Sequence, residues 1–455
     1  MKTALSPLSS SLSNLTVISN SPNTDRIKNE INEYNNLREE INLIYQKKGK
    51  GSIIRSKCKC IERGEKPTAF FFNLEKRNYN RKSIKKLEGA EDTTFTNEDE
   101  ILNEIETFYK QLYNSGLDEN DLFDLFVQGL KTPKLQDQQK NELEGEITLA
   151  ECKLVLRTFN NGKSPGADGF TWEFYNCFFD LLGQDLVNCF NEAYVKGEMS
   201  ISQRRGLISL LPKEDANLLK LANWRPITLL NVDYKIASKV IATRFEKVLD
   251  LLISPDQTGF LKGRYIGQNI RLVNDVVEQT KIQNIPGILV QLDFCKVFDT
   301  IEWSLIKRSL VLFNFGDSIQ QWVSTFYNNS ESAVLNNGFC TNFFKLSRGV
   351  RQGCPLSPYL FIVGAEILAC KIRQDKTIKG ITVFEKELKL SQLADDTTLL
   401  CNDCNSVNQA ITVLNSFGNL SGLKLNPSKT KALWLGSLRN CKDKPFNFQV
   451  AQRTT

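Results

Sequence analysis

The chain has 455 residues, a formal net charge of +6 at neutral pH and no histidine. Its length exceeds the roughly 250 to 300 residues that one hydrophobic core usually supports, so we expect two or three lobes. The lack of histidine excludes Ser-His-Asp and Cys-His catalysis, zinc bound by histidine and any nuclease that depends on histidine.

The first 24 residues are rich in Ser, Thr and Asn and contain no sustained apolar run. They predict a disordered leader, which is neither a signal peptide nor a membrane anchor. Apolar residues then recur at helical spacing from Ile27 to Ile44, which predicts an amphipathic helix. No window approaches the ~18 apolar residues of a membrane span, so we expect no membrane partner.

A basic block follows at residues 45–88, with fourteen Lys and Arg against four Glu. Aromatic side chains are interleaved with these cations, a composition suited to the backbone and bases of a nucleic acid. A solvated helix face above core phenylalanines explains any one of these residues equally well. The aromatic residues interleaved with the cations are Phe70, Phe71, Phe72 and Tyr79.

The twelve cysteines are scattered through apolar segments, as at Cys177, Cys189 and Cys370. This distribution favours buried free thiols in a reducing compartment inside the cell, without distinguishing nucleus from cytoplasm. Cys401 and Cys404 have the spacing of a zinc knuckle, but no second pair or histidine follows them. The sequence therefore argues against a zinc site.

The middle of the chain predicts a hairpin and a helix. Residues 207–211 and 227–230 have the apolar, β-branched character of two strands. Apolar positions from 232 to 253 recur at helical spacing, and Ser254 and Pro255 end that helix.

The second half of the chain predicts alternating strands and helices. Residues 288–292 form a short, nearly continuous apolar run typical of a buried strand, with Asp293 at its end. A helix is expected over 359–372, with Ser357 as its N-cap and Pro358 as its first residue. Three antiparallel strands are expected at 381–383, 388–393 and 397–400, which makes the fold class α+β.

Asp395 and Asp396 lie between two of these strands, at a predicted hairpin tip. Neighbouring carboxylates repel each other, so a divalent cation between them is a natural partner. An ordinary turn explains the pair alone, because Asp caps its own backbone there. With Asp293 as a third ligand, the set suits two Mg²⁺ ions in phosphoryl transfer.

Three ordered motifs resemble the palm motifs of reverse transcriptases, in particular those of non-LTR retrotransposons of the long interspersed type. These motifs are residues 293–299, 348–358 and 393–396. Further segments extend the resemblance, which covers the chain from about residue 50 to 436. The additional segments are 164–170, 223–231 and 257–260 upstream, and 421–431 downstream.

The resemblance implies a right-hand polymerase with fingers and a palm, in which helices pack on an antiparallel palm sheet. From this sequence we expect neither the histidine-dependent endonuclease that usually precedes such a polymerase nor a complete thumb, since nineteen residues after 436 are too few for a helical bundle. No motif sets an oligomeric state. The expected organisation is a leader at 1–24, a basic helical extension at 25–145, fingers and upper palm at 146–285, palm at 286–436 and a short tail at 437–455.

The resemblance also implies an RNA-directed DNA polymerase. Such an enzyme adds deoxynucleotides to the 3′-hydroxyl of a DNA or RNA primer on an RNA template. Two Mg²⁺ ions, or Mn²⁺ in their place, would be held by Asp293, Asp395 and Asp396. The alternative is a catalytically silent remnant of a retrotransposon that keeps the fold and a surface for nucleic acid.

The family pattern implies roles for further residues. Lys213 and Arg225 would contact the triphosphate, and Lys429 would protonate the departing pyrophosphate, with Lys431 as a competitor. Phe298 would block a ribose 2′-hydroxyl, while Asp299 is expected to cap a helix. The remaining assignments are Arg351, Gln352 and Gly353 to the nucleotide pocket, and Gly263 and Arg264 to the template.

Each of these roles has a plain structural alternative. Lys213 and Arg225 could form surface ion pairs, and Phe298 could be a core side chain. The sequence also departs from the family pattern at three positions. Leu393 stands where an aromatic is usual, Cys295 where an acid or polar residue is common, and Cys60 where tryptophan is frequent.

Overall fold

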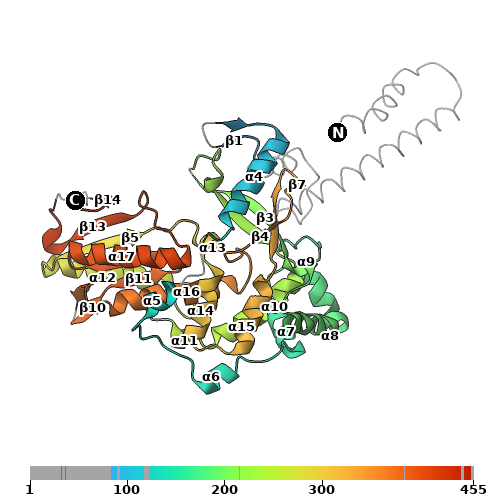
Figure 1. The fold of residues 1–455 in the computed structure, drawn as a ribbon, viewed down its shortest axis with the longest axis horizontal. Coiled ribbons are helices and arrows are strands. Elements are labelled where there is room, and N and C mark those ends of the chain that lie inside the picture. The colour runs from blue at the N-terminus through green and yellow to red at the C-terminus, as the bar shows by residue number, and fades with distance from the viewer. Residues whose placement is uncertain are drawn as a thin grey trace, which may run out of the picture. The chain divides into compact units, whose positions relative to one another are not determined.

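The computed structural model describes residues 83–89, 93–116, 122–214, 216–383, 385–441 and 445–451, together with Asn32 and Asn36, which are helical. The predicted leader, the predicted helix at 27–44 apart from Asn32 and Asn36, and the basic block up to residue 82 lie outside the described residues. The chain divides into two units, and the second, Ile84–Thr455, contains every element discussed below (Figure 1).

One five-stranded sheet, here called the palm sheet, has the order β11-β12-β5-β13-β14. Its first four strands pair antiparallel, as predicted, whereas β14 joins β13 in parallel. The apolar run at 288–292 becomes β5, in the centre of the sheet. The strands are β5 (Gly287–Leu292), β11 (Leu390–Leu393), β12 (Asp396–Cys401), β13 (Lys431–Leu435) and β14 (Gln449–Ala451).

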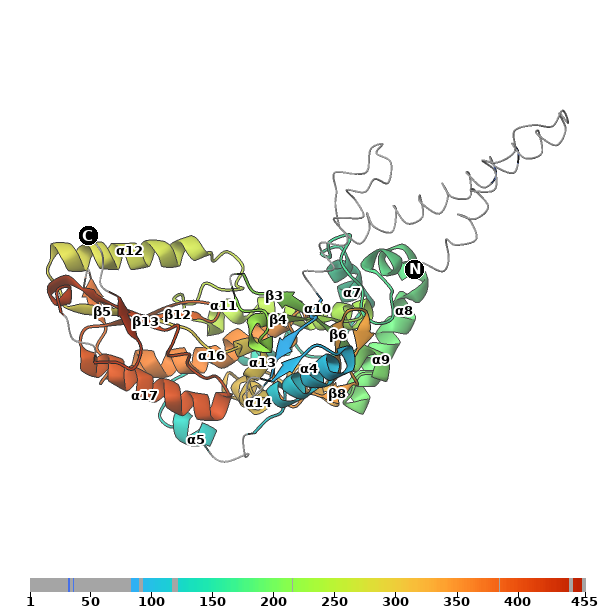
Figure 2. The same ribbon diagram turned by 90° about the horizontal axis from the view of Figure 1, so that it is seen from above.

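Helices cover both faces of the palm sheet (Figure 2). Side chains alternate along β5, so Ile288, Val290 and Leu292 enter one core while Leu289 faces another. The larger core contains residues of α16 (Ser357–Gln374) and α17 (Cys404–Ser421). The smaller one contains Val276 of α12 (Ile266–Ile282).

A second sheet, here called the fingers sheet, has the order β4-β3-β6-β7, with β8 also paired to β6. The predicted hairpin forms its β3 and β4, while β6 pairs in parallel with β3. Helix α4 (Glu98–Leu112) contributes Ile101, Ile105 and Tyr109 to the core of this sheet. The strands are β3 (Arg205–Pro212), β4 (Trp224–Leu229), β6 (Glu331–Asn336), β7 (Phe339–Cys340) and β8 (Phe344–Lys345).

The remaining elements are mostly helices that pack around these two sheets (Figure 1). The helices are α5 (Leu122–Val127), α6 (Asp137–Asn141), α7 (Leu149–Leu156), α8 (Trp172–Lys196), α9 (Ile201–Arg204), α10 (Val232–Glu246), α11 (Leu249–Leu252), α13 (Val297–Thr300), α14 (Trp303–Leu312) and α15 (Asp317–Tyr327), with short 3₁₀ turns η3 (Leu221–Asn223) and η4 (Gly436–Leu438). Two small hairpins complete the set, β1 (Leu87–Glu88) with β2 (Thr94–Phe95), and β9 (Ile381–Val383) with β10 (Lys386–Leu388).

Several predicted elements differ in detail. The helix expected over 232–253 is interrupted after Glu246, giving α10 and α11. The strand expected at 388–393 divides between β10, which pairs with β9, and β11, which pairs with β12. The extension expected to be helical also contains the β1–β2 hairpin.

Helix α16 begins differently from the expected cap. Ser357 lies inside the helix and Leu356 precedes it without a side-chain cap. The hydroxyl of Ser357 instead lies 3.3 Å from the hydroxyl of Tyr327 on α15. A buried contact between helices has therefore replaced the local one.

The chain crosses between the two sheets more often than predicted. The expected boundary at residue 285 does not separate them, because β6, β7 and β8 follow palm strand β5 in sequence yet belong to the fingers sheet. The chain then returns to the palm sheet at β11. Both sheets are thus built from residues distant in sequence.

The cysteines are not uniformly buried. Cys370 is buried as expected, but Cys177 and Cys189 are exposed on α8. In the part of the chain that the structure describes, no helix is both long enough and apolar enough to cross a membrane.

Candidate active site

The two neighbouring aspartates lie at the tip of the β11–β12 hairpin, as predicted. Leu393 pairs with Asp396, so Ala394 and Asp395 form a two-residue loop. Ala394 has φ of +56°, in the left-handed region that costs a residue with a Cβ atom about 1 kcal/mol or more. The surrounding structure must therefore hold this loop.

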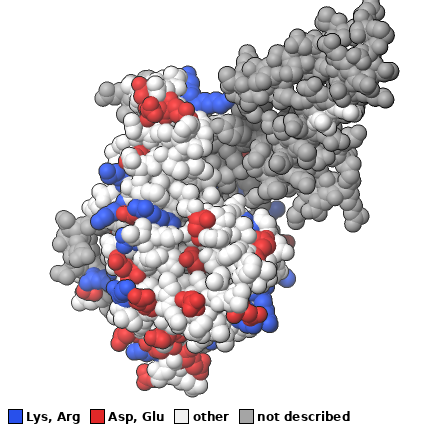
Figure 3. All heavy atoms as spheres, turned by 90° about the vertical axis from the view of Figure 1, so that its right-hand side faces the viewer, with Lys and Arg blue, Asp and Glu red and all other residues white. Residues whose placement is uncertain are grey.

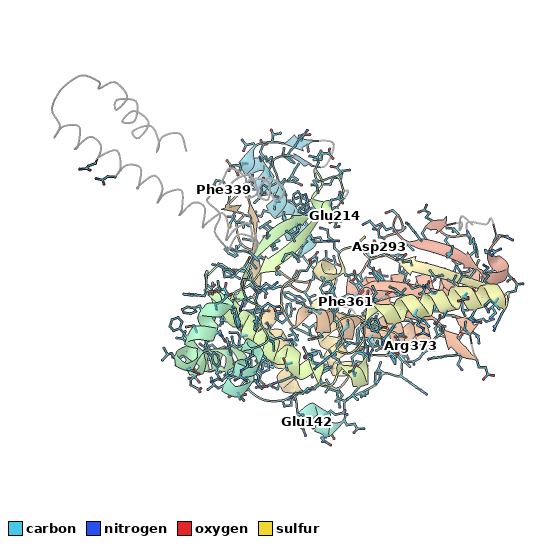
Figure 4. The ribbon with its side chains drawn as sticks, turned by 180° about the vertical axis from the view of Figure 1, so that it is seen from behind. Glu142, Glu214, Asp293, Phe339, Phe361 and Arg373 are labelled. Carbon is cyan, nitrogen blue, oxygen red and sulfur yellow. The ribbon has the colours of Figure 1, made fainter. Side chains whose placement is uncertain are left out.

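Asp293 reaches the same edge of the palm sheet from β5. Thr397 of β12 pairs with Leu292, so continuing the ladder by one residue sets Asp396 opposite Asp293. Figure 4 shows Asp293 on the side of the palm sheet that faces the tip of the β3–β4 hairpin, where Glu214 is labelled. The fold thus brings Asp293 to the same place as Asp395 and Asp396, which lie about 100 residues later in the sequence.

A loop between α17 and β13 fixes Asp293. The Asn426 side chain donates from Nδ2 to Asp293 Oδ2 over 2.9 Å, and its backbone N–H donates to the Asp293 carbonyl over 2.7 Å. The hydroxyl of buried Thr430 accepts from the Asp293 N–H and donates to the Asn426 carbonyl. One carboxylate oxygen and the backbone of Asp293 are therefore held from one side.

The carboxylates form a site of concentrated negative charge. Burial raises the pKa of Asp395, and the charges of Asp396 and Asp293 raise it further. Among the described residues, no three His, Cys, Asp or Glu side chains lie close enough together to hold an ion as they stand.

Three cationic side chains lie around these carboxylates. Burial lowers the pKa of Lys213, the charges of Lys429 and Arg225 lower it further, and Asp293 opposes the change. The Lys213 Nζ also donates to the Ala222 carbonyl over 3.0 Å. The β3–β4 hairpin supplies Lys213 and Arg225, and the loop that holds Asp293 supplies Lys429.

The face shown in Figure 3 has a different distribution of charge. The described Lys and Arg side chains there are interspersed with Asp and Glu, so they form no patch of positive charge alone.

Phe298 lies on α13, five residues beyond Asp293. Its ring stacks on Phe361 of α16 at 5.0 Å between centroids, and the ring of Phe260 meets it edge-on at 6.1 Å. Phe298 is half-buried, so part of its side chain stays accessible. The packing is compatible with both the nucleotide role and the core role.

Gln352 and Gly353 dock the loop before α16 against the fingers strand β4. The Thr228 N–H donates to the Gln352 carbonyl over 2.7 Å. Gly353 has φ of +126°, and a Cβ atom there would lie 2.5 Å from the Thr228 carbonyl oxygen. This close approach requires glycine.

Arg351 is buried, at 3% exposure, and points away from solvent. Its guanidinium donates to the Arg204 carbonyl and lies over the ring of Tyr234. Its Nε and Nη1 have no hydrogen-bond partner among the described residues. A role of Arg351 in the nucleotide pocket stays a prediction.

Gly263 and Arg264 lie in the loop before α12. Gly263 has φ of +83°, with open space around it. The Arg264 guanidinium donates to the carbonyls of Ile253, Ser254 and Gln257 and pairs with Asp250. These contacts hold the end of α11 and give Arg264 a structural role; contact with a template stays a prediction.

Sequence reasoning missed residues that support the site. Asp299 does not cap α13, since Lys296 precedes that helix. Its buried carboxylate accepts from the Tyr113 hydroxyl over 2.9 Å and from Gln352 Nε2 over 3.1 Å. The sequence did hold a signal for Asn426, because an amide side chain directly before proline is typical of a turn. It held no signal for the contact between Asp299 and Tyr113, which are 186 residues apart.

Comparisons with known proteins agree with this geometry. Residues 211–448 match the model of the reverse transcriptase (RNA-dependent DNA polymerase) family. The match covers more than half of the chain and includes β4 and the β11–β12 hairpin, whereas most of β3 lies before it. The chain belongs to the reverse transcriptase family.

Its relatives indicate the branch of that family. The chain is 33% identical over 410 residues to the transposon TX1 uncharacterized 149 kDa protein of Xenopus laevis, covering 90% of this chain and 31% of that protein. It is 28% identical over 288 residues to a Pol polyprotein from retrotransposable element R2 of Popillia japonica, covering 62% of this chain and 39% of that protein. The chain therefore belongs to the non-LTR retrotransposon branch of the reverse transcriptase family, and it spans less than two-fifths of either relative.

Proposed function

We propose that this chain adds deoxynucleotides to a primer 3′-hydroxyl on an RNA template by two-metal phosphoryl transfer. The observation that carries the proposal is the convergence of Asp293, Asp395 and Asp396 at one sheet edge, with three cations around them. Carboxylates suit a divalent metal, and cations suit a triphosphate.

The donor set fits hard divalent cations. It consists of carboxylate oxygens, and the repulsion that raises the pKa of Asp395 is the kind that Mg²⁺ or Mn²⁺ relieves. Bound there, two such ions would activate the primer hydroxyl and offset charge on the phosphoryl oxygens. Asn426 would keep Asp293 oriented meanwhile, since it occupies only Oδ2 of that carboxylate.

The surrounding residues then take separate tasks. Lys213 and Arg225 bind the triphosphate from the fingers side, and Lys429 delivers a proton to the leaving pyrophosphate. Phe298 lies beneath the sugar and excludes a 2′-hydroxyl. Gln352 and Gly353 form the wall of the nucleotide pocket, next to β4.

Primer extension by the purified chain on a homopolymer RNA template tests the proposal. We expect Mg²⁺-dependent extension, and its loss in Asp395→Asn with RNA affinity unchanged, because the carboxylates bind metals and other residues bind phosphates. The matched control is Asp185→Asn, an exposed position on α8, which should extend normally.

Two results would contradict the proposal. Substantial synthesis by Asp395→Asn would remove the two-metal assignment. A wild-type chain that binds RNA without extending any primer would instead identify a catalytically silent nucleic-acid-binding remnant.

A further inference from the structure

The segment between α11 and α12 extends the palm sheet beside the catalytic hairpin. The Gln392 N–H of β11 donates to the Asp256 carbonyl over 2.8 Å, and the Thr258 N–H donates to the Gln392 carbonyl over 2.9 Å. Gln257 thus forms a parallel bridge with Gln392, two residues before Ala394. The backbone pairing ends there.

The side chain of Gln257 continues this pairing by one further step. Its Nε2 donates to the Ala394 carbonyl over 3.0 Å, and its Oε1 accepts from the Ala394 N–H over 2.8 Å. The same Oε1 accepts from the Gly259 N–H over 2.8 Å. The carboxamide therefore occupies the place of a peptide group and binds both polar atoms of Ala394.

The contact between Gln257 and Ala394 is buried and closely packed, and neighbouring side chains hold the backbone on the Gln257 side. Gln257 is 2% exposed, and a Cβ atom on Gly259 would lie 2.2 Å from the Ala394 nitrogen. Arg264 holds the Gln257 carbonyl, and Arg373 of α16 binds both oxygens of Asp256 at 2.9 and 2.8 Å. The backbone around Gln257 is therefore held by these contacts. We call the hydrogen bonds between the Gln257 carboxamide and Ala394 the clamp.

We propose that Gln257 is a positioning residue that fixes the strained loop carrying Asp395, so that the carboxylate is in place before metal and nucleotide arrive. The inference rests on the proposed function and adds to it a residue that touches no substrate. Ala394 keeps its left-handed conformation because both of its polar backbone atoms are bound. Displacement of a catalytic group by about 1 Å can cost roughly 10²-fold in rate.

Two substitutions at one position separate positioning from general stability. Gln257→Met keeps the length and removes all three hydrogen bonds. Gln257→Glu keeps the shape, but a carboxylate has no proton to donate to the Ala394 carbonyl. Once protonated, the glutamic acid can donate there again while its other oxygen accepts, and burial raises its pKa toward the working range. Thr258→Val is the matched control, since Thr258 bonds to Asn269 and the Gln392 carbonyl and to no atom of the loop.

The first measurement is kcat for primer extension, taken as a ratio to wild type at pH 8 and pH 6. We expect Gln257→Met to lose roughly 10²-fold at both values, with little change in the KM for nucleotide. Gln257→Glu should lose as much at pH 8 and recover about tenfold at pH 6. Thr258→Val should stay within about threefold of wild type. A Gln257→Met variant that keeps the kcat of wild type would overturn the proposal.

The second measurement does not need activity. Hydrogen exchange of peptides covering residues 390–397 should accelerate in Gln257→Met and stay unchanged in Thr258→Val, because among the described residues the Ala394 N–H donates to Gln257 and not to Thr258. Unchanged exchange in Gln257→Met would also overturn the proposal. If the wild-type chain fails to extend primers, the proposed function fails and the exchange comparison alone decides whether the clamp exists.

Discussion

At the scale of single residues, the proposed role of Phe298 in selecting deoxynucleotides can be tested by substitution. The Phe298 ring packs against Phe361 and Phe260, and in the proposed role these contacts would keep it from turning away from a ribose 2′-hydroxyl. We expect Phe298→Val to lower the preference for deoxynucleotides over ribonucleotides roughly tenfold to a hundredfold.

The measurement is kcat/KM for each nucleotide under identical conditions. Phe339→Val, at an exposed position on β7, serves as the control and should keep the wild-type preference. If the preference of Phe298→Val is unchanged, Phe298 belongs to the core and not to the pocket.

Asp299 predicts a pH dependence of stability. Burial raises its pKa to about 6, although Lys296, Tyr113, Gln352 and Lys213 oppose the change. Because the folded-state pKa lies above the unfolded value of about 3.9, this group makes the folded state less stable as pH rises from about 4 to 6. The expected loss is about 2 to 3 kcal/mol, and it is complete above pH 6.

Asp299→Asn isolates this contribution, because all other titrating groups cancel in the comparison. The free energy of unfolding of wild type minus that of Asp299→Asn should fall between pH 4 and 7, as measured by urea unfolding at each pH. A difference that stays flat across this range would show that Asp299 titrates normally. Burial also lowers the pKa of the nearby Lys296 to about 8, so measurements should stop at pH 7.

The sequence located the three carboxylates but not their supports. Asp293, Asp395 and Asp396 could be identified because strand patterns and motifs are local in sequence. Asn426, Gln257 and Asp299 act through contacts across 133, 137 and 53 residues, and no local pattern encodes such contacts. Arg264 has contacts that the sequence did not indicate, with three carbonyls and Asp250, while its contact with a template stays a prediction.

At the scale of elements, the contact between the loop before α16 and strand β4 depends on Gly353. Gly353→Ala would bring a Cβ atom within 2.5 Å of the Thr228 carbonyl oxygen, at a φ of +126°. We expect a loss of about 1 to 3 kcal/mol in unfolding free energy and a raised KM for nucleotide.

Gly338→Ala provides the comparison for this prediction. Gly338 also has a positive φ, +89°, but nothing lies within 4 Å of its Cβ position. It should lose only the backbone cost of about 1 kcal/mol, with an unchanged KM. Equal effects of the two substitutions on KM would show that the β4 contact does not shape the pocket.

Elements with strong periodicity were predicted best. The β3–β4 hairpin, β5 and the β11–β12 hairpin lie where the sequence places them, because alternation and turn residues act locally. The break between α10 and α11 and the division of 388–393 were missed, since tertiary packing decides them. Strand β14 was not expected, because its pairing with β13 depends on a neighbouring strand.

At the scale of the whole second unit, the two sheets are not independent. Strand β3 pairs with β6, which follows palm strand β5 in the chain. Opening the fingers sheet therefore disturbs segments that lead directly into the palm. We expect amides of β3 and β5 to exchange through the same cooperative opening, with free energies that converge as urea is raised.

Native-state hydrogen exchange of peptides covering β3 and β5 measures this directly. The β9–β10 hairpin forms a two-stranded sheet of its own, so it should exchange through a separate, smaller opening and serves as the internal reference. If β3 opens at a much lower free energy than β5 at all urea concentrations, the fingers sheet unfolds on its own despite the interleaved chain.

The central position of β5 also has a consequence for synthesis on the ribosome. Its two partners, β12 and β13, lie later in the sequence, so Leu292 is made 109 residues before Cys401 completes β12. At roughly 5 to 20 residues per second, this apolar strand waits on the order of 5 to 20 s without a partner. During that interval Asp293 and its neighbours are available to chaperones and to other nascent chains, and the order of translation sets how long that exposure lasts.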